Sequence, residues 1–274
     1  MMLACILSRA ASAEPERFVV CYGNDAAAQD FAPYSRAVLD DDHHPPLAPL
    51  KARGIQLFGY VSLGEIDSKR RLYQETAGLL LGRNPNWPDA HYVDLRNPVW
   101  HALILDRIIP DLLAQGFDGI FLDTLDDAGF LEHADPVRNH GMIAAAAALV
   151  REIHDRFPTI PLMLNRAYDV GILVADTLDS VLAESLASTY DFKTRRYNLR
   201  PKADLDWGMA RLAELRQRNP RLRLYSLDYW NPDDHAGIVQ LYDRERSAGL
   251  IPYVATVDLQ RIIPEPRDVR RAAR

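Results

Sequence analysis

The sequence is poor in cysteine, in long apolar runs and in positive charge, and each shortage excludes a class of protein. Only two of the 274 residues are cysteines, and only Cys21 would remain if a leader were removed after Ala13, which excludes an internal disulfide framework. No apolar run approaches the roughly 18 residues of a membrane span. The formal net charge of −6 argues against a nucleic-acid-binding protein, because such proteins usually present a basic face.

The motifs of several catalytic classes are absent as well. No G-x-G-x-x-G or phosphate-binding loop follows an apolar run, which disfavours nucleotide binding. No G-x-S-x-G segment offers a serine nucleophile. His43 and His44 are adjacent and lack the i, i+4 spacing of a zinc-binding helix, so we predict no metal and no cofactor. A magnesium or manganese site formed by Asp123, Asp126 and Glu184 stays an alternative, however, because oxygen ligands follow no strict spacing in the sequence.

The two ends of the chain have a different composition from the rest. Residues 1–17 begin with an apolar stretch, and Ala11-Ser12-Ala13 resembles a signal-peptide cleavage site. The nearest basic residue, Arg9, follows the apolar stretch instead of preceding it. Secretion or a periplasmic location is therefore one expectation, and a cytoplasmic location is the alternative. Residues 263–274 are rich in arginine and form an expected basic tail.

Between these ends, short apolar runs alternate with helical stretches, which is typical of βα repeats with a parallel sheet. Parallel strands are covered on both faces and read as continuous apolar runs. Eight such units in 274 residues favour one closed (β/α)8 barrel over residues 18–262. The expected strands are residues 18–22, 37–39, 57–61, 119–122, 162–164, 181–183, 222–227 and 253–255.

Capping residues predict where several helices begin and end. The helix that begins at Asn97-Pro98 should run to Gly116, a usual helix terminator. The helix that begins at Asp135-Pro136 should end before Pro158. The stretch from Gly64 to Asp94 is longer than a simple loop, and we expect it to extend over the barrel mouth. Helices should start at Asn97-Pro98, Asp135-Pro136, Asp204 and Asp233.

Polar residues follow the expected strands, at the face where barrel enzymes build their active sites. Asp123 and Glu184 directly follow apolar core runs, where a carboxylate costs free energy unless it is paired, hydrogen-bonded or used. Asn165 ends the strand between them and could orient either carboxylate. An acidic residue after a strand can also cap the next helix, and Asp126 and Asp127 are the best candidates for that role.

Two carboxylates facing each other across a barrel mouth suit glycoside hydrolysis, in which one donates a proton and the other attacks or activates water. Other residues near the same face would shape the sugar subsites, and aromatic rings there can stack on sugars. Tyr60 is expected to pack in the core. The expected substrate-binding residues are Tyr22, Asp40, Glu65, Asp126, Asn165, Asp228, Tyr229 and Trp230.

Four segments resemble glycoside hydrolase family 114, the group of endo-α-1,4-polygalactosaminidases and TM1410-like barrel proteins, and also the related hydrolase domain of the bacterial Pel polysaccharide machinery. The most specific segment is G-F-D-G-I-F-L-D-T-L-D at residues 116–126; the others are residues 58–65, 164–165 and 183–185. The resemblance implies a (β/α)8 barrel that cleaves α-1,4-linked galactosamine or N-acetylgalactosamine polymers without a cofactor. It places the catalytic pair at Asp123 and Glu184, with Asp126 as the alternative aspartate.

Two other functions remain open at this stage. One is a barrel that binds glycans without cleaving them, in a polysaccharide export or adhesion system. A separation of more than about 10 Å between Asp123 and Glu184, or arginines engaging both, would favour it over the hydrolase geometry. The other is a metal-dependent lyase or hydrolase on the same fold, which a chelator would inactivate.

Overall fold

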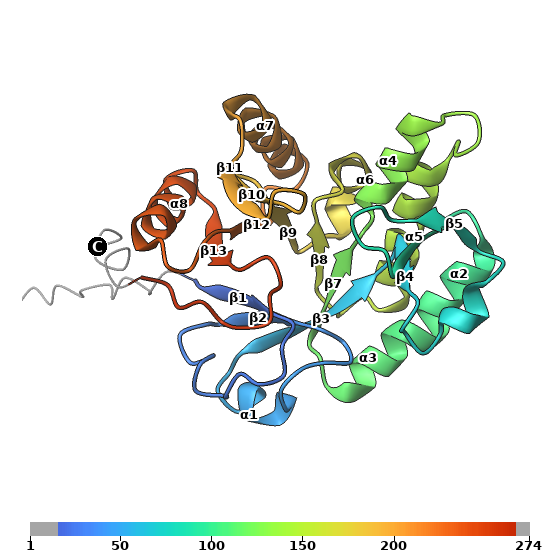
Figure 1. Cartoon of the computed structure of the whole chain (residues 1–274). Coiled ribbons are helices and arrows are strands. Elements are labelled where there is room, and N and C mark those ends of the chain that lie inside the picture. Colours follow the sequence, from blue (N-terminus) through green and yellow to red (C-terminus); the bar gives the residue numbers. More distant parts are fainter. Residues whose placement is uncertain (1–15, 267–274) are drawn as a thin grey trace, which may run out of the picture.

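The computed structural model describes residues 16–266 and consists of a parallel eight-stranded sheet surrounded by helices (Figure 1). The strand order is β1-β2-β3-β7-β8-β9-β12-β13, and all seven pairings are parallel. The outer strands β1 and β13 lie beside each other, so the sheet is nearly closed. The predicted barrel is confirmed. Its strands are β1 Phe18–Cys21, β2 Arg36–Leu39, β3 Gln56–Ser62, β7 Gly119–Asp123, β8 Leu162–Asn165, β9 Ser180–Glu184, β12 Arg223–Tyr229 and β13 Ile251–Ala255.

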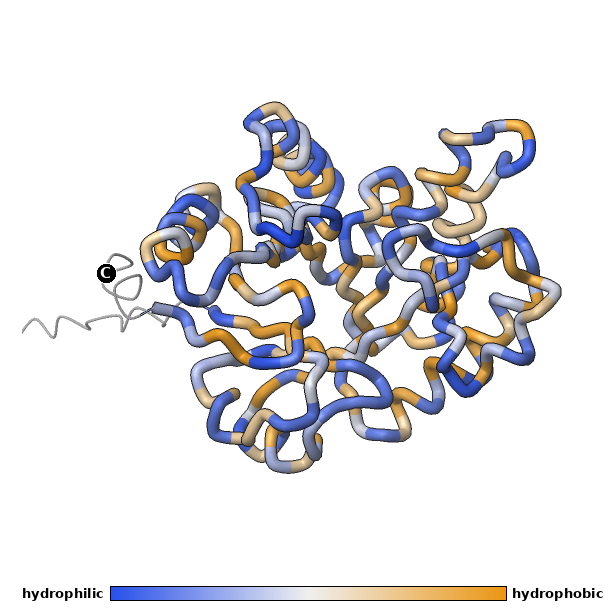
Figure 2. Tube along the Cα trace, viewed as in Figure 1, coloured by the Kyte–Doolittle hydropathy of each residue, from blue (hydrophilic) through white to orange (hydrophobic). Residues whose placement is uncertain are grey.

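The core lies on both faces of this sheet, and Figure 2 shows hydrophobic residues concentrated along the strands. Each large apolar side chain that is fully buried contributes about 1.5–3 kcal/mol. Gly59 in β3 lets the helix α3 (Ile109–Gln115) approach the sheet closely, because a Cβ atom there would lie 2.4 Å from Cδ1 of Leu112. Any larger residue at position 59 would require the Leu112 side chain to move.

The helix predicted after Asn97 forms as one continuous unit. It contains α2 (Pro98–Leu103), a single π turn η2 (Ile104–Ile108) and α3. The side chain of Asn97 accepts a hydrogen bond of 3.0 Å from the Val99 N–H, and Gly116 ends the helix with a left-handed φ of 108°. Pro110 lacks an N–H, which accounts for the widened turn before it.

The prediction that Asp135 begins a helix was wrong. Helix α4 (Asp126–Ala134) ends immediately before Asp135, and α5 (Met142–Arg156) begins seven residues later. Oδ1 of Asp135 accepts a hydrogen bond of 3.0 Å from the Arg138 N–H. Aspartate followed by proline therefore makes a local turn here, because its side chain bonds the main chain just downstream.

Two of the other predicted helix starts differ slightly from the structure. Helix α7 (Lys202–Arg218) begins after Pro201, and Asp204 lies in its first turn. Helix α8 (His235–Ser247) is capped by Asp234, whose Oδ1 accepts a 3.0 Å hydrogen bond from the Gly237 N–H, and not by the preceding aspartate. The remaining helical elements are α1 Leu47–Lys51, η1 Tyr73–Thr76, α6 Tyr168–Val174 and η3 Ala175–Thr177.

Two excursions interrupt the βα pattern. As the sequence predicts, the segment after β3 is more than a loop: it forms a three-stranded antiparallel sheet of β4 (Glu65–Asp67), β5 (Leu80–Arg83) and β6 (Ala90–Val93). The second excursion is a hairpin of β10 (Ser188–Asp191) and β11 (Arg196–Leu199), which follows β9 and was not predicted.

None of the helices within residues 16–266 is long and apolar enough to cross a membrane. The expected signal-like segment falls almost wholly on residues 1–15, and most of the expected basic tail on residues 267–274; both lie outside the described residues.

Candidate active site

A cleft of about 1130 Å³ opens at the carboxyl ends of the strands. Its walls include strand ends, the β4-β6-β5 sheet and residues of α3, α4, α6 and α7 (Lys202–Arg218). Of the ten predicted site residues, eight line this cleft: Tyr22, Asp40, Glu65, Asp123, Asp126, Asn165, Glu184 and Tyr229.

A single side chain joins Asp123 to Glu184. Nδ2 of Asn165 donates hydrogen bonds of 2.8 Å to Oδ1 of Asp123 and 2.6 Å to Oε2 of Glu184. These two carboxylate oxygens are therefore at most about 5.4 Å apart, the sum of the two distances. The arrangement follows from the strand order, because β8 lies between β7 and β9 and each residue is the last of its strand.

Two tyrosines complete the surroundings of the pair. The hydroxyl of Tyr229 donates a hydrogen bond of 2.7 Å to Oε1 of Glu184, so both oxygens of that carboxylate are acceptors. Tyr60 forms a hydrogen bond with Asp123 and lines the cleft. The expected core role of Tyr60 is therefore only partial. Tyr22 packs edge-on against Tyr60, with ring centroids 5.4 Å apart.

Burial and mutual repulsion perturb the acidity of the pair. Burial, followed by the nearby charge of Glu184, raises the pKa of Asp123 to about 7, although the hydrogen bond from Asn165 opposes this shift. A negative charge this close disfavours ionisation of Asp123. Asp123 therefore retains a proton up to about neutral pH.

The residue after each of the three strand ends has a left-handed backbone. Thr124 has φ of 64°, Arg166 of 49° and Ser185 of 51°. None is glycine, and such conformations cost about 1–3 kcal/mol each unless the surroundings impose them. The sharp turns end each strand at the point where Asp123, Asn165 and Glu184 meet, so local strain accompanies the assembly of the site.

Asp126 has a different environment from Asp123. It lies 3.5 Å from the guanidinium of Arg166. Burial raises the pKa of Asp126 and the charge of Arg166 opposes this. Helix α4 is not capped by its side chain. By contrast, neither Asp123 nor Glu184 forms an ion pair with an arginine of the described residues. Of the two aspartates, it is therefore Asp123 that a single side chain, Asn165, links to Glu184.

Glu65 forms a second carboxyl pair, with a residue that sequence reasoning had assigned only as a cap. Asp127 shares a hydrogen bond with Glu65. Nδ2 of Asn84 donates a hydrogen bond of 2.6 Å to Oε1 of Glu65. Burial, followed by the charge of Glu65, raises the pKa of Asp127 to about 10. Both carboxyl groups line the cleft. The only sequence signal for Asp127 was its place in an acidic run.

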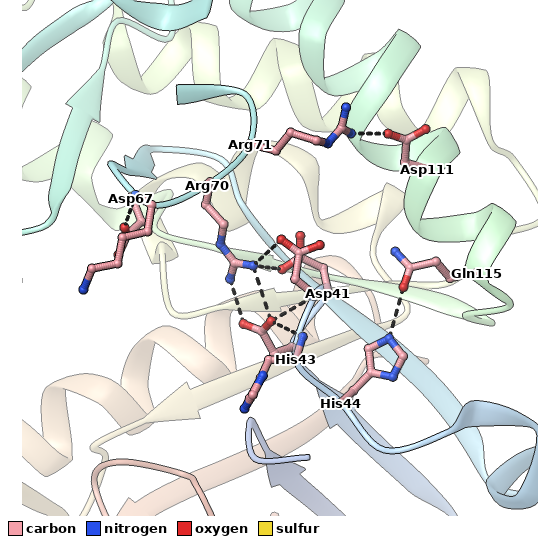
Figure 3. A network of polar contacts seen from close by, with 11 residues as sticks. Asp41, His43, His44, Asp67, Arg70, Arg71, Asp111 and Gln115 are labelled. Atoms are coloured by element: carbon pink, nitrogen blue, oxygen red, sulfur yellow. Dashed lines mark hydrogen bonds and ion pairs between the residues drawn. The ribbon is translucent and has the colours of Figure 1, made fainter. Parts of the chain in front are cut away.

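Figure 3 shows a network of polar contacts around Arg70, whose side chain lines the cleft. Arg70, from the turn after β4, lies 2.7, 2.8 and 3.0 Å from the carboxylates of three consecutive aspartates, Asp40, Asp41 and Asp42. Burial raises the pKa of Asp41 to about 6 although Arg70 opposes it. Asp40 is thus at the cleft as predicted, but it forms an ion pair with Arg70, which no local sequence pattern identifies.

Asp228 and Trp230 do not line the cleft, and their expected sugar contacts need correction. Asp228 is 0% exposed and accepts hydrogen bonds from the main chain of Ala187 and Ser188. Trp230 donates a hydrogen bond of 2.9 Å to Asp234 at the start of α8. Side chains alternate in direction along a strand, so Tyr229 points to the cleft while Asp228 points to the helix layer.

Other aromatic residues than Trp230 provide apolar surface in the cleft. Trp207, 56% exposed, packs edge-on against Tyr168 at a centroid distance of 5.5 Å. Trp87 and Phe130, 52% and 58% exposed, also line the cleft. They come from α7, the β5–β6 loop and α4. None of these three stands at a strand end, which is why the sequence did not single them out.

Comparisons with known proteins show similarity to a glycoside hydrolase domain over most of the chain. Two structures of the glycoside hydrolase domain of PelA from Pseudomonas aeruginosa, one of them a variant, superpose with a TM-score of 0.81; they are 27% and 26% identical, and the match covers 92% of this chain and 98% of theirs. Ega3 of Aspergillus fumigatus, solved in complex with galactosamine, has a TM-score of 0.67 over 93% of this chain and 98% of its own, but 15% identity shows only a shared fold. An uncharacterized protein of Deinococcus radiodurans is 27% identical over 82% of this chain and 72% of its own.

The fold and its similarity to the PelA glycoside hydrolase domain define the chain as a glycosidase. The sequence profile of glycoside-hydrolase family GH114 matches residues 7–270. The chain belongs to that family, and the resemblance stated from its sequence is confirmed.

Proposed function

We propose that this protein is an endo-acting hydrolase of α-1,4-linked polysaccharides containing galactosamine or N-acetylgalactosamine, with Asp123 and Glu184 as its catalytic pair. The observation that carries the proposal is the single Asn165 amide nitrogen bonded to both carboxylates. It holds two acidic groups on either side of one small space, as cleavage of a glycosidic bond requires.

The charge of the cleft supports an amino-sugar substrate. Twelve carboxyl side chains but only three arginines line it, and two of those arginines lie against Asp40–Asp42 and Asp111. A cleft lined by one sign of charge attracts ligands of the other. Free amino groups of deacetylated galactosamine are cationic near neutral pH. Ega3, which shares the fold, was solved in complex with galactosamine, an amino sugar of this class.

The carboxylate spacing supports a double-displacement mechanism. Retaining glycosidases place their carboxyl groups about 5–5.5 Å apart, whereas inverting enzymes leave about 6.5–9.5 Å for a water molecule. The upper limit of about 5.4 Å between the facing oxygens fits the first class. One carboxylate attacks the anomeric carbon while the other protonates the departing glycosidic oxygen. The second then removes a proton from the water that hydrolyses the glycosyl-enzyme intermediate.

The size and lining of the cleft support endo cleavage. Its volume is about 1130 Å³, and its lining includes the catalytic pair together with Arg70, Trp87, Phe130 and Trp207. Aromatic faces of this kind stack on sugar rings, and a polymer would then contact several subsites at once. The small-residue segment Ala11-Ser12-Ala13 supports the further proposal that the protein is exported to reach such a polymer.

Product analysis tests this function. The enzyme is incubated with partially deacetylated α-1,4-galactosaminogalactan and, separately, with the β-1,4-linked amino polymer chitosan. We expect oligosaccharides of intermediate length from the first polymer and none from the second. Release of monosaccharide alone would contradict endo action. Cleavage of chitosan at a comparable rate would contradict the linkage.

A further inference from the structure

Asp228 and Glu245 form a carboxyl pair inside the protein that the catalytic scheme leaves unused. Asp228 belongs to β12 and Glu245 to α8, which packs against β13. They are 0% and 1% exposed, and neither lines the cleft. Two buried carboxyl groups in contact cost free energy unless hydrogen bonds and a proton stabilise them. Their partners indicate what they do.

Asp228 anchors the chain just beyond Glu184. Its Oδ1 accepts hydrogen bonds of 3.0 Å from the Ala187 N–H and 2.5 Å from the Ser188 N–H. The Ser188 hydroxyl lies 3.0 Å from the same oxygen and 2.9 Å from the carbonyl of Tyr229. Tyr229 is the residue whose hydroxyl bonds Glu184. The anchored segment therefore connects to Glu184 both along the chain and through Tyr229.

Glu245 supplies the other half of the arrangement. Its Oε2 accepts a hydrogen bond from the Ser226 hydroxyl, and its carboxyl shares a hydrogen bond with Asp228. Oε1 of Glu245 and Oδ2 of Asp228 are buried and receive no hydrogen bond from any N–H or hydroxyl donor of the described residues. Two carboxyl groups can bond each other only through a proton, so one of them is protonated.

The charges around the pair place the proton on Glu245. Burial, then the negative charge of Asp228 on β12, raise the pKa of Glu245 well above its ordinary value. Arg244 of α8 opposes the shift, but less strongly. Oδ1 of Asp228 already accepts from two main-chain N–H groups.

We propose that Asp228 and protonated Glu245 are positioning residues that hold Glu184 in its catalytic orientation, and that loss of their shared proton releases it. The inference rests on the proposed catalytic role of Glu184. Ser185, with its left-handed backbone, is tied to β12 by a 2.8 Å hydrogen bond from its N–H to the Leu227 carbonyl. With the pair intact, residues 185–188 are fixed at both ends. Two adjacent negative charges in the core would push β12 and α8 apart and loosen that segment.

Variants that separate the proton from the shape of Glu245 provide the test. In Glu245→Gln the amide donates to Asp228 and its oxygen accepts from Ser226, yet the side chain cannot titrate. We expect kcat at pH 7 within about threefold of wild type and an advantage in Tm over wild type that grows as pH rises from 6 to 9. Glu245→Ala leaves Asp228 without its donor and should lower kcat at least about tenfold with KM within about twofold.

Glu184→Gln, assayed alongside, keeps the two proposals apart. Retained activity in that variant would overturn the catalytic role of Glu184, whereas the Tm comparison would still report the buried proton. Wild-type kcat in Glu245→Ala would overturn the positioning role. A Tm difference between Glu245→Gln and wild type that does not change with pH would overturn the shared proton, and this comparison stands even if Glu245→Ala fails to fold.

Discussion

The hydroxyl of Tyr229 donates a hydrogen bond of 2.7 Å to Oε1 of Glu184, and the two residues come from neighbouring strands, β12 and β9. Tyr229 is only 5% exposed, so this bond is shielded from solvent. A hydrogen bond to a charged group contributes about 1.5–3 kcal/mol. Tyr229 thus helps to hold the Glu184 carboxyl group in place in the cleft.

Removal of this bond should slow catalysis without greatly weakening binding. We expect Tyr229→Phe to reduce kcat by about 10- to 100-fold, since the ring remains and only the donor is lost. Steady-state kinetics on the polymer give kcat and KM separately. Tyr22→Phe is the matched control, because Tyr22 lines the same cleft but makes no hydrogen bond with Glu184. An equal loss of kcat in both variants would contradict a specific role for the Tyr229 hydroxyl.

Asn165 should control the pH at which Asp123 loses its proton. Burial and the charge of Glu184 raise the pKa of Asp123, and the hydrogen bond from Asn165 offsets part of that rise. Asn165→Ala should therefore move the alkaline limb of the kcat/KM profile to higher pH and reduce kcat by about 100-fold or more, because the two carboxylates lose their common donor. An alkaline limb that stays in place or moves to lower pH would show that Asn165 does not tune the pair.

Asp123 should make the protein less stable as pH rises. Its pKa is about 7 in the folded protein and near 3.8 in an unfolded chain. Between these values the unfolded chain ionises first, so the stabilising effect of the bound proton is complete below pH 3.8 and lost by about pH 7. Asp123→Asn should be inactive yet have a higher Tm than wild type at pH 8, by about 2–4 °C for each kcal/mol gained. The difference should shrink toward pH 4. A lower Tm than wild type at pH 8 would contradict this account.

The stereochemical outcome follows from the distance between the two facing oxygens. Retention of the α configuration is expected, because at most about 5.4 Å separates them and no water fits between carboxylate and sugar. Proton NMR of the first products, recorded before mutarotation, distinguishes the anomers. A β anomer as the first product would show that the pair acts by inversion.

The sequence predicted the barrel and the strand-end residues well because both depend on local patterns. Continuous apolar runs gave all eight strands, and the last residue of three of them gave Asp123, Asn165 and Glu184. Strand order then brought these three together. Asp127 and Arg70 were missed as functional residues because their importance comes from contacts with Glu65 and with Asp40–Asp42, far away in the sequence.

The wrong predictions also have physical causes. Asp228 follows the same strand-end rule as Asp123, but strand alternation turns it away from the cleft, and the strand continues to Tyr229. Asp135-Pro136 reads as a helix start, but α4 ends beside it and the helix expected there, α5, begins only at Met142. A one-residue error in where a strand ends reverses the direction of a side chain, and no local pattern fixes that residue.

Release of reducing ends from partially deacetylated α-1,4-galactosaminogalactan, in the presence of a chelator, tests the central claim most directly. Wild type should cleave the polymer, whereas Asp123→Asn and Glu184→Gln should lose at least about a thousandfold in kcat. Asp126→Asn, which removes the carboxylate paired with Arg166, should retain measurable cleavage. Full activity in either of the first two variants, or no cleavage by folded wild type, would contradict the assignment of Asp123 and Glu184 as the catalytic pair of a metal-independent galactosaminidase.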